Sequence, residues 1–105
     1  MGDTIHKQRE FKTDGELYDE SLRRKTKKEA FELYEKIIKE IDTLGFITII
    51  DVVCGISKFP MPKNWQYACT HGWTRKSVIR FTIHELEDKR WGVYLGSPHV
   101  LLNDI

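Results

Sequence analysis

The side chains best suited to chemistry in this chain are two cysteines and two histidines: Cys54, Cys69, His71 and His84. Structural zinc sites usually present their ligands in close pairs such as C-x2-C, whereas only Cys69 and His71 are near neighbours here. A cysteine nucleophile also needs a base and an orienting group, and no third group or glycine-rich turn accompanies Cys69. Cys54 is better explained as a small buried hydrophobe. Since phosphate-loop, dinucleotide-binding and metalloprotease motifs are missing too, we expect no metal site, no cofactor and no enzymatic activity.

Basic residues interleaved with aromatic ones offer a second kind of chemistry, the recognition of nucleic acid. Positive charge follows phosphates, and aromatic faces stack on bases. The residues that would carry this function are Arg23, Arg24, Lys27, Lys28, Lys63, Arg75, Lys76, Arg80 and Arg90. The structural alternative is that these cations coat a domain whose aromatic residues are buried. Because the net charge of +1 is far from the strongly basic balance of a dedicated nucleic-acid binder, we keep this function as the alternative.

The segment over residues 57–76, which begins with a long connection over residues 57–72, is the strongest candidate for a binding surface. Pro60 and Pro62 exclude a helix and a central strand around them, and long loops in small domains often carry binding. Aromatic and arginine side chains commonly dominate the energy of protein interfaces. We predict that a partner protein contacts this loop and its flank through Lys58, Phe59, Met61, Lys63, Trp65, Trp73, Arg75 and Lys76. The alternative is that the aromatic residues close over a small core.

A long amphipathic helix would position this loop. Thr26 and Glu29 have the spacing of a capping box, and apolar residues then recur at three- and four-residue steps. Gly45 stands where a left-handed residue would end the helix. Residues 46–50 predict a short buried strand, and Asp51 would cap a brief helical turn after it.

Alternating apolar residues predict a β-hairpin over residues 77–95. Ile79, Phe81 and Ile83 would share one face of its first strand, and a charged turn precedes Trp91 in the second. The predicted architecture is α+β, with one long amphipathic helix packed on a small, mostly antiparallel β-sheet.

The N-terminal part of the chain is less regular. Residues 14–25 are compatible with a helical lead-in to the long helix, whereas residues 1–13 show no period. We therefore predict a flexible segment over residues 1–13 and a single α+β domain over residues 14–105.

Length and composition are those of one ordinary globular domain. The chain has 105 residues, of which 40% are hydrophobic and 31% charged. No apolar run approaches the roughly 20 residues needed to span a bilayer, and the N-terminus lacks the apolar core of a signal peptide. We expect a cytoplasmic protein that does not enter a membrane, with reduced cysteines.

Several short motifs resemble a family of small, uncharacterised proteins of tailed bacteriophages that infect Gram-positive hosts. The motifs are the long helix, the GFITIID segment at residues 45–51, Gly55-Ile56, the GWT segment at residues 72–74, and DKRWGVYL at residues 88–95 followed by Pro98. In that family a GxVTVADL-like segment leads through a variable loop to a GWTDL-like segment and a C-terminal hairpin. The resemblance extends from about Glu29 to Leu101.

This resemblance implies a biological setting and no catalytic residues. It implies a small accessory protein made inside an infected or lysogenic bacterium. By analogy with other small phage proteins, we expect non-covalent binding to a bacterial host protein or an anti-phage defence protein, with inhibition as its effect. The chain would work as a monomer or as a homodimer.

Overall fold

The fold combines helices with two small antiparallel sheets, as seen in a computed structural model that describes residues 11–101. The helical elements are α2 (Asp14–Ser21), α3 (Lys27–Leu44), the π-helical η1 (Asp51–Ile56), α4 (Trp65–Thr70) and the 3-10 helix η2 (Arg75–Arg80). The strands are β1 (Arg23–Arg24), β2 (Phe46–Thr48), β3 (His71–Thr74), β4 (Thr82–Glu85), β5 (Trp91–Tyr94) and β6 (His99–Val100). One sheet has the order β1-β5-β4 and the other β2-β3-β6, and all pairings are antiparallel. The predicted α+β class is confirmed.

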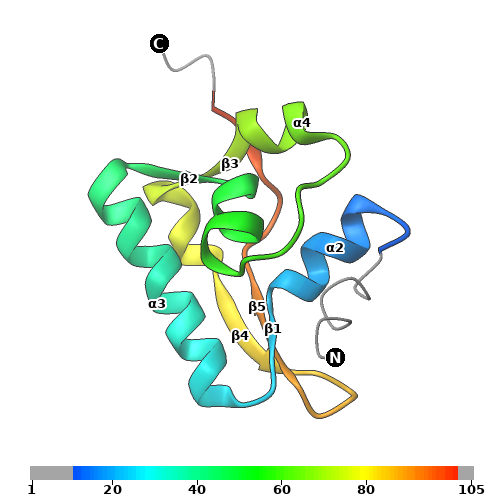
Figure 1. Ribbon diagram of the computed structural model, residues 1–105. Coiled ribbons are helices and arrows are strands. Elements are labelled where there is room, and N and C mark those ends of the chain that lie inside the picture. Colours follow the sequence, from blue (N-terminus) through cyan, green and yellow to red (C-terminus); the bar gives the residue numbers. More distant parts are fainter. Residues whose placement is uncertain (1–10, 102–105) are drawn as a thin grey trace.

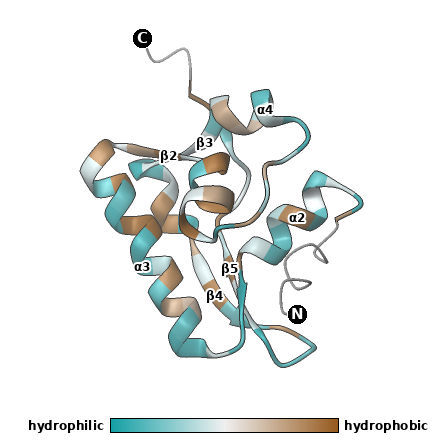
Figure 2. Ribbon diagram, viewed as in Figure 1, coloured by the Kyte–Doolittle hydropathy of each residue, from teal (hydrophilic) through white to brown (hydrophobic). Residues whose placement is uncertain are grey.

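Helix α3 holds the two sheets together. It runs along one side of the molecule and contacts strands of both sheets (Figure 1). Its buried stripe consists of Ala30, Leu33, Ile37 and Ile41, each at most 2% exposed. Hydrophobic and hydrophilic segments alternate along the helix, as its amphipathic pattern requires (Figure 2). Burial of each large aliphatic side chain contributes about 1.5–3 kcal/mol, so this stripe is a main source of stability.

Local signals set both ends of α3. The Thr26 hydroxyl accepts a hydrogen bond from the Glu29 backbone N–H at 3.1 Å, which is the N-cap predicted from the sequence. At the other end Gly45 has a φ of 90°, and its N–H donates to the Ile41 carbonyl at 2.7 Å. A left-handed residue is most easily a glycine, so the helix ends where the sequence indicates.

The predicted arrangement of one long helix packed on one sheet is only partly confirmed. The lead-in before α3 is a separate helix, α2, whose N-cap is the Thr13 hydroxyl. It cannot continue into α3 because β1 lies between them and pairs with β5. The β residues also divide into two sheets, one formed around the hairpin and one around β3.

Of the predicted flexible segment, the structure describes residues 11–13. Thr13 caps α2, and the ring of Phe11 lies 5.8 Å from that of Phe59. The remainder of that prediction, residues 1–10, lies outside the described residues.

The predicted hairpin is present but shorter. Strands β4 and β5 pair in the register Thr82 to Tyr94 and Glu85 to Trp91. The residues before β4 form η2 instead of extending the strand, because Thr74 and Ser77 cap this helix reciprocally. Ile79 is 88% exposed and Phe81 is buried, so the prediction that the two side chains share one face of a strand is wrong.

The second sheet is built around β3. Gly72 pairs with Thr48 on one side and with His99 on the other. Trp73, the next residue, is completely buried. After β2 the chain turns into η1 through a capping box, in which Thr48 N–H donates to the Asp51 carboxylate and Asp51 N–H donates to the Thr48 hydroxyl. Asp51 is the first residue of η1 and Ile50 holds the N-cap position, so the prediction that Asp51 is the N-cap is wrong.

Candidate protein-binding surface

The loop over residues 57–64 is fastened to the domain at both ends. At its start Ser57 and Phe59 donate backbone hydrogen bonds to Val52 and Val53 of η1. At its end the Asp14 carboxylate accepts the backbone N–H groups of residues 63 and 64, at 2.8 and 2.9 Å. The loop therefore presents its side chains from defined backbone positions.

The predicted loop ends earlier than expected, because residues 65–70 form α4. The Asn64 side chain accepts the Tyr67 N–H and caps this helix, which is the local signal missed when residues 57–72 were interpreted as one connection. The helix turns large side chains outward, since Trp65 is 51% exposed and Tyr67 45% exposed. Met61, just before the helix, is 58% exposed. These three side chains are available to a partner.

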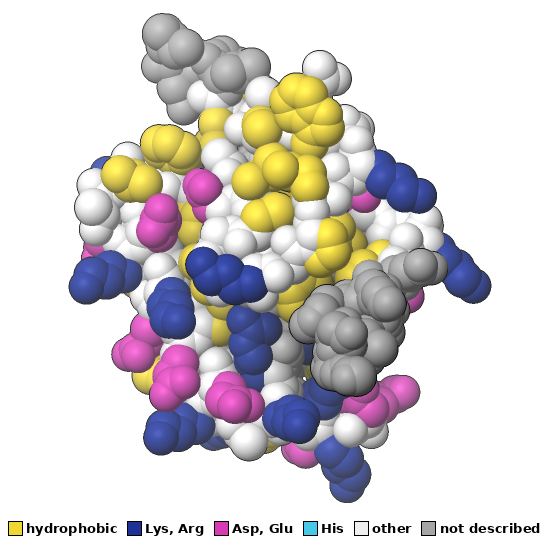
Figure 3. All heavy atoms as spheres, in the orientation of Figure 1, with side chains coloured by type: hydrophobic (Ala, Val, Ile, Leu, Met, Phe, Trp, Pro, Cys, Tyr) yellow, Lys and Arg dark blue, Asp and Glu magenta, His cyan; other side chains and the backbone are white. Residues whose placement is uncertain are grey.

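Trp65 is part of a wider exposed apolar surface. It lies four residues before Cys69, so the two side chains share one face of α4. Cys69 in turn lines a hollow of about 350 Å³ together with Leu44 and Phe46, which are 53% and 40% exposed. We call the set Trp65, Cys69, Leu44 and Phe46 the apolar face. Figure 3 shows hydrophobic side chains gathered in the upper part of the molecule, over α4 and the segment leading to it, whereas charged residues dominate the lower part.

Leu44 and Phe46 were not predicted as site residues. Both were assigned to structural elements, Leu44 to the apolar stripe of the helix and Phe46 to a buried strand. They flank Gly45, where the chain reverses at the edge of the domain, so both side chains are left outside. The end of an amphipathic stripe at a left-handed glycine was the signal that could have found them.

Two of the predicted anchors belong to the core. Trp73 is 0% exposed, and its indole N–H donates to the Gly96 carbonyl at 3.3 Å. Phe59 is partly buried and packs against the core cluster. Trp73 lies in the central strand of its sheet, which explains its burial, and it is withdrawn as an anchor. For these residues the alternative that aromatic side chains close the core was correct.

The basic residues of the predicted binding set have different environments. Lys58, Lys63 and Lys76 are exposed. Arg75 donates to the Asp42 backbone carbonyl at 2.9 Å and lies against Gly45, so it interacts with the C-terminal end of α3. A cation at that position offsets the negative end of the helix dipole.

Most arginines of the nucleic-acid set are engaged within the protein. Arg24 donates to the Ser21 and Arg23 carbonyls and to the Ser57 hydroxyl, and burial lowers the pKa of its guanidinium. Arg90 forms a bidentate pair with Glu20 and also contacts Asp88. The hydrogen bonds from Arg90 are the main reason that the pKa of Glu20 is lowered. These arginines are not free to follow a phosphate backbone.

The remaining members of that set are scattered. Arg23 pairs with Glu20 at 2.9 Å, and the ammonium of Lys27 lies 5.5 Å from the ring centre of Trp91. Lys28 and Arg80 are exposed, on α3 and η2 respectively. The nine cations of the set therefore do not form one basic stripe.

The cysteines and histidines do not converge. Cys54 is partly buried, its Sγ–H donates to the Pro60 carbonyl at 3.6 Å, and burial raises the pKa of the thiol. The His71 ring stacks on Tyr67 at 3.8 Å, whereas His84 lies in the other sheet. Within residues 11–101 no three His, Cys, Asp or Glu residues are grouped closely enough to hold a metal ion.

Comparison with known proteins adds no relative. No family model, no curated protein and no solved structure matches this chain. Among residues 11–101, no helix has the length and apolar character needed to cross a membrane.

Proposed function

We propose that this protein acts by non-covalent binding of another protein, through the apolar face and the neighbouring side chain of Met61. The observation that carries the proposal is the concentration of exposed apolar residues on and around α4, where Met61 and Trp65 are each more than half exposed. Large exposed apolar patches on a small domain mark interaction sites more often than chance. The hollow beside Cys69 offers a place for one apolar side chain of the partner.

The hydrogen bonds that hold the loop in place favour binding. The Asp14 carboxylate fixes the backbone just before Trp65, so less conformational freedom is lost when a partner binds. Tryptophan and methionine are enriched at the centres of interfaces, where they fill pockets of the partner. The partner surface is expected to be apolar at its centre and acidic at its rim, because Lys58 and Lys63 flank the exposed side chains.

The setting of this function follows from the resemblance described above. The partner would be a bacterial host protein or an anti-phage defence protein, met in the cytoplasm of the bacterial cell and inhibited when its surface is covered. The protein would act as a monomer or as a homodimer without a cofactor.

The test compares three purified variants as baits in bacterial lysate. Trp65→Ala and Phe46→Ala remove side chains of the apolar face, whereas Ile79→Ala removes an even more exposed apolar side chain on η2, outside that face. A true partner is retained by the unchanged protein and by Ile79→Ala, and its retention falls at least tenfold with Trp65→Ala. Calorimetry with the purified partner should then give similar affinities for the unchanged protein and Ile79→Ala, and a weaker affinity for Trp65→Ala. Equal retention by all three variants would remove the proposal.

Nucleic-acid binding stays the alternative, and it would depend on the exposed Lys28, Lys63, Lys76 and Arg80. A mobility-shift assay with labelled DNA and RNA at about 50 mM salt measures it directly, since binding through phosphates is strongest at low salt. The paired arginines give it no support.

A further inference from the structure

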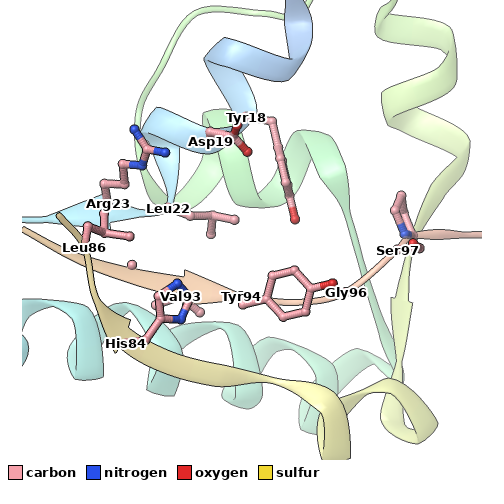
Figure 4. Close-up of a pocket in the computed structure, with 12 residues that line it drawn as sticks. Tyr18, Asp19, Leu22, Arg23, His84, Leu86, Val93, Tyr94, Gly96 and Ser97 are labelled. Atoms are coloured by element: carbon pink, nitrogen blue, oxygen red, sulfur yellow. The ribbon is translucent and has the colours of Figure 1, made fainter.

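A second site lies away from the apolar face, between α2 and the β4–β5 hairpin. It is a cleft of about 340 Å³, close to the lower limit of typical ligand pockets. Tyr18, Asp19 and Arg23 form one wall, and His84 and Tyr94 lie on the other (Figure 4). Its size suits a single side chain or a small organic molecule.

The charges around the cleft do not cancel evenly. Arg23 is paired with Glu20, which also holds Arg90, and Arg90 is paired with Asp88. Among residues 11–101 the Arg23 guanidinium lies 2.9 Å from the Glu20 carboxylate, which offsets its positive charge beside the cleft. Asp19, by contrast, is exposed and makes no ion pair within residues 11–101. One uncompensated carboxylate therefore faces the cleft.

Two tyrosines provide the aromatic surface beside this carboxylate. The Tyr18 ring stacks on Trp73, with 6.1 Å between ring centres, and this contact fixes its orientation. Burial raises the pKa of Tyr18, and the neighbouring Asp19 and Tyr94 raise it further, so the hydroxyl stays protonated. Within the described part of the chain that hydroxyl makes no hydrogen bond. Tyr94 stands opposite and is 56% exposed (Figure 4).

We propose that this cleft binds an organic cation, a guanidinium or ammonium group, between Tyr18 and Tyr94 with Asp19 as its counter-ion. Aromatic faces attract cations through their quadrupole, and a carboxylate beside them supplies the opposite charge. The cation has two sources, an arginine or lysine side chain of a partner protein or a small free amine.

The probe is Nα-acetyl-L-arginine amide, added to the full-length protein and followed by two-dimensional NMR. Its neutral isostere, Nα-acetyl-L-citrulline amide, is the matched control ligand. The expected result is saturable shifts at residues 18–23, 84 and 92–97 with the arginine compound, and at least tenfold weaker binding of the citrulline compound. A short arginine-containing peptide distinguishes the sources: tighter binding of the peptide points to a partner side chain, and equal binding to a free amine.

Two variants in the cleft and one control variant on α3 locate the site. Asp19→Asn keeps the shape and removes the charge, so binding should weaken about fivefold. Asp42→Asn changes an exposed carboxylate on α3 and should leave binding unchanged. Tyr94→Leu removes one aromatic face at an exposed position, where folding tolerates the change. The proposal is overturned by equal binding of arginine and citrulline, by equal effects of Asp19→Asn and Asp42→Asn, or by shifts that appear only with adenosine monophosphate as an anionic probe.

Discussion

We expect the substitution Gly72→Ala, which adds a single methyl group, to lower the stability of the fold strongly. A Cβ at residue 72 would lie 1.9 Å from the Ile47 carbonyl oxygen and 2.7 Å from the Thr48 Cα. Contacts between carbon and oxygen in sheets lie near 3.3–3.6 Å, so β2 and β3 would have to separate by more than about 1 Å. Both contacts are with backbone atoms, which cannot move aside by a change of side-chain rotamer.

The magnitude follows from what that separation breaks. Ile47 pairs with Trp73, and both side chains are completely buried. Loss of one or two backbone hydrogen bonds at about 0.5–1.5 kcal/mol each, together with poorer packing around these side chains, gives about 3–5 kcal/mol for Gly72→Ala. That is a large share of the roughly 5–15 kcal/mol by which domains are stable.

Thermal unfolding followed by circular dichroism measures the effect, with Gly55→Ala as the matched control. No atom lies within 4 Å of a Cβ at residue 55, and this glycine is in the helical η1. Its replacement should change stability by less than about 1 kcal/mol, in the stabilising direction. Gly72→Ala should lower Tm by more than about 12 °C. A Gly72→Ala protein that melts within a few degrees of the unchanged chain would refute the packing of β2 against β3.

Three further outcomes follow from the structure. Ile37→Ala on the buried stripe of α3 should cost about 2–5 kcal/mol in urea unfolding, whereas Phe31→Ala, at a 48% exposed position, should cost much less. The pKa of Glu20 is lowered in the folded state, so its pairing stabilises the fold above the unfolded pKa. That stability is lost as the pH falls through the folded pKa. Glu20→Gln should therefore remove this part of the acid dependence of the free energy of unfolding. Cys69 is exposed while burial raises the pKa of the Cys54 thiol, so Ellman's reagent at pH 8 should modify Cys69 first, as mass spectrometry of digested samples would show; equal rates would contradict this.

Features specified by near neighbours were predictable. The N-cap at Thr26, the left-handed Gly45 and the presence of a hairpin before and after the charged turn each depend on a few adjacent residues. Predictions failed where two local signals competed. Alternation suggested a strand through Ile79, but the reciprocal caps of Thr74 and Ser77 favoured a 3-10 helix.

The candidate surface was predictable only in part. Pro60 and Pro62 indicated where the loop lies. Met61 and Trp65 are exposed, as a binding role requires. Trp73 could not be assigned to the core from composition, because its burial depends on β2 and β6 pairing on both sides of β3. Leu44 and Phe46 join the surface only because the chain brings α4 next to the reversal at Gly45.

By itself the sequence determined which segments are helical or extended where capping, period and turn residues agree within a few positions. Only the tertiary structure decided which cations remain available, because Arg90 meets Glu20 across 70 residues and Arg24 meets Ser57 across 33. A charge is visible in the sequence, but its partner is set by chain reversals whose contacts are long-range. For that reason the sequence could not show that Arg24 and Arg90, two of the basic residues, hold elements of the folded protein together.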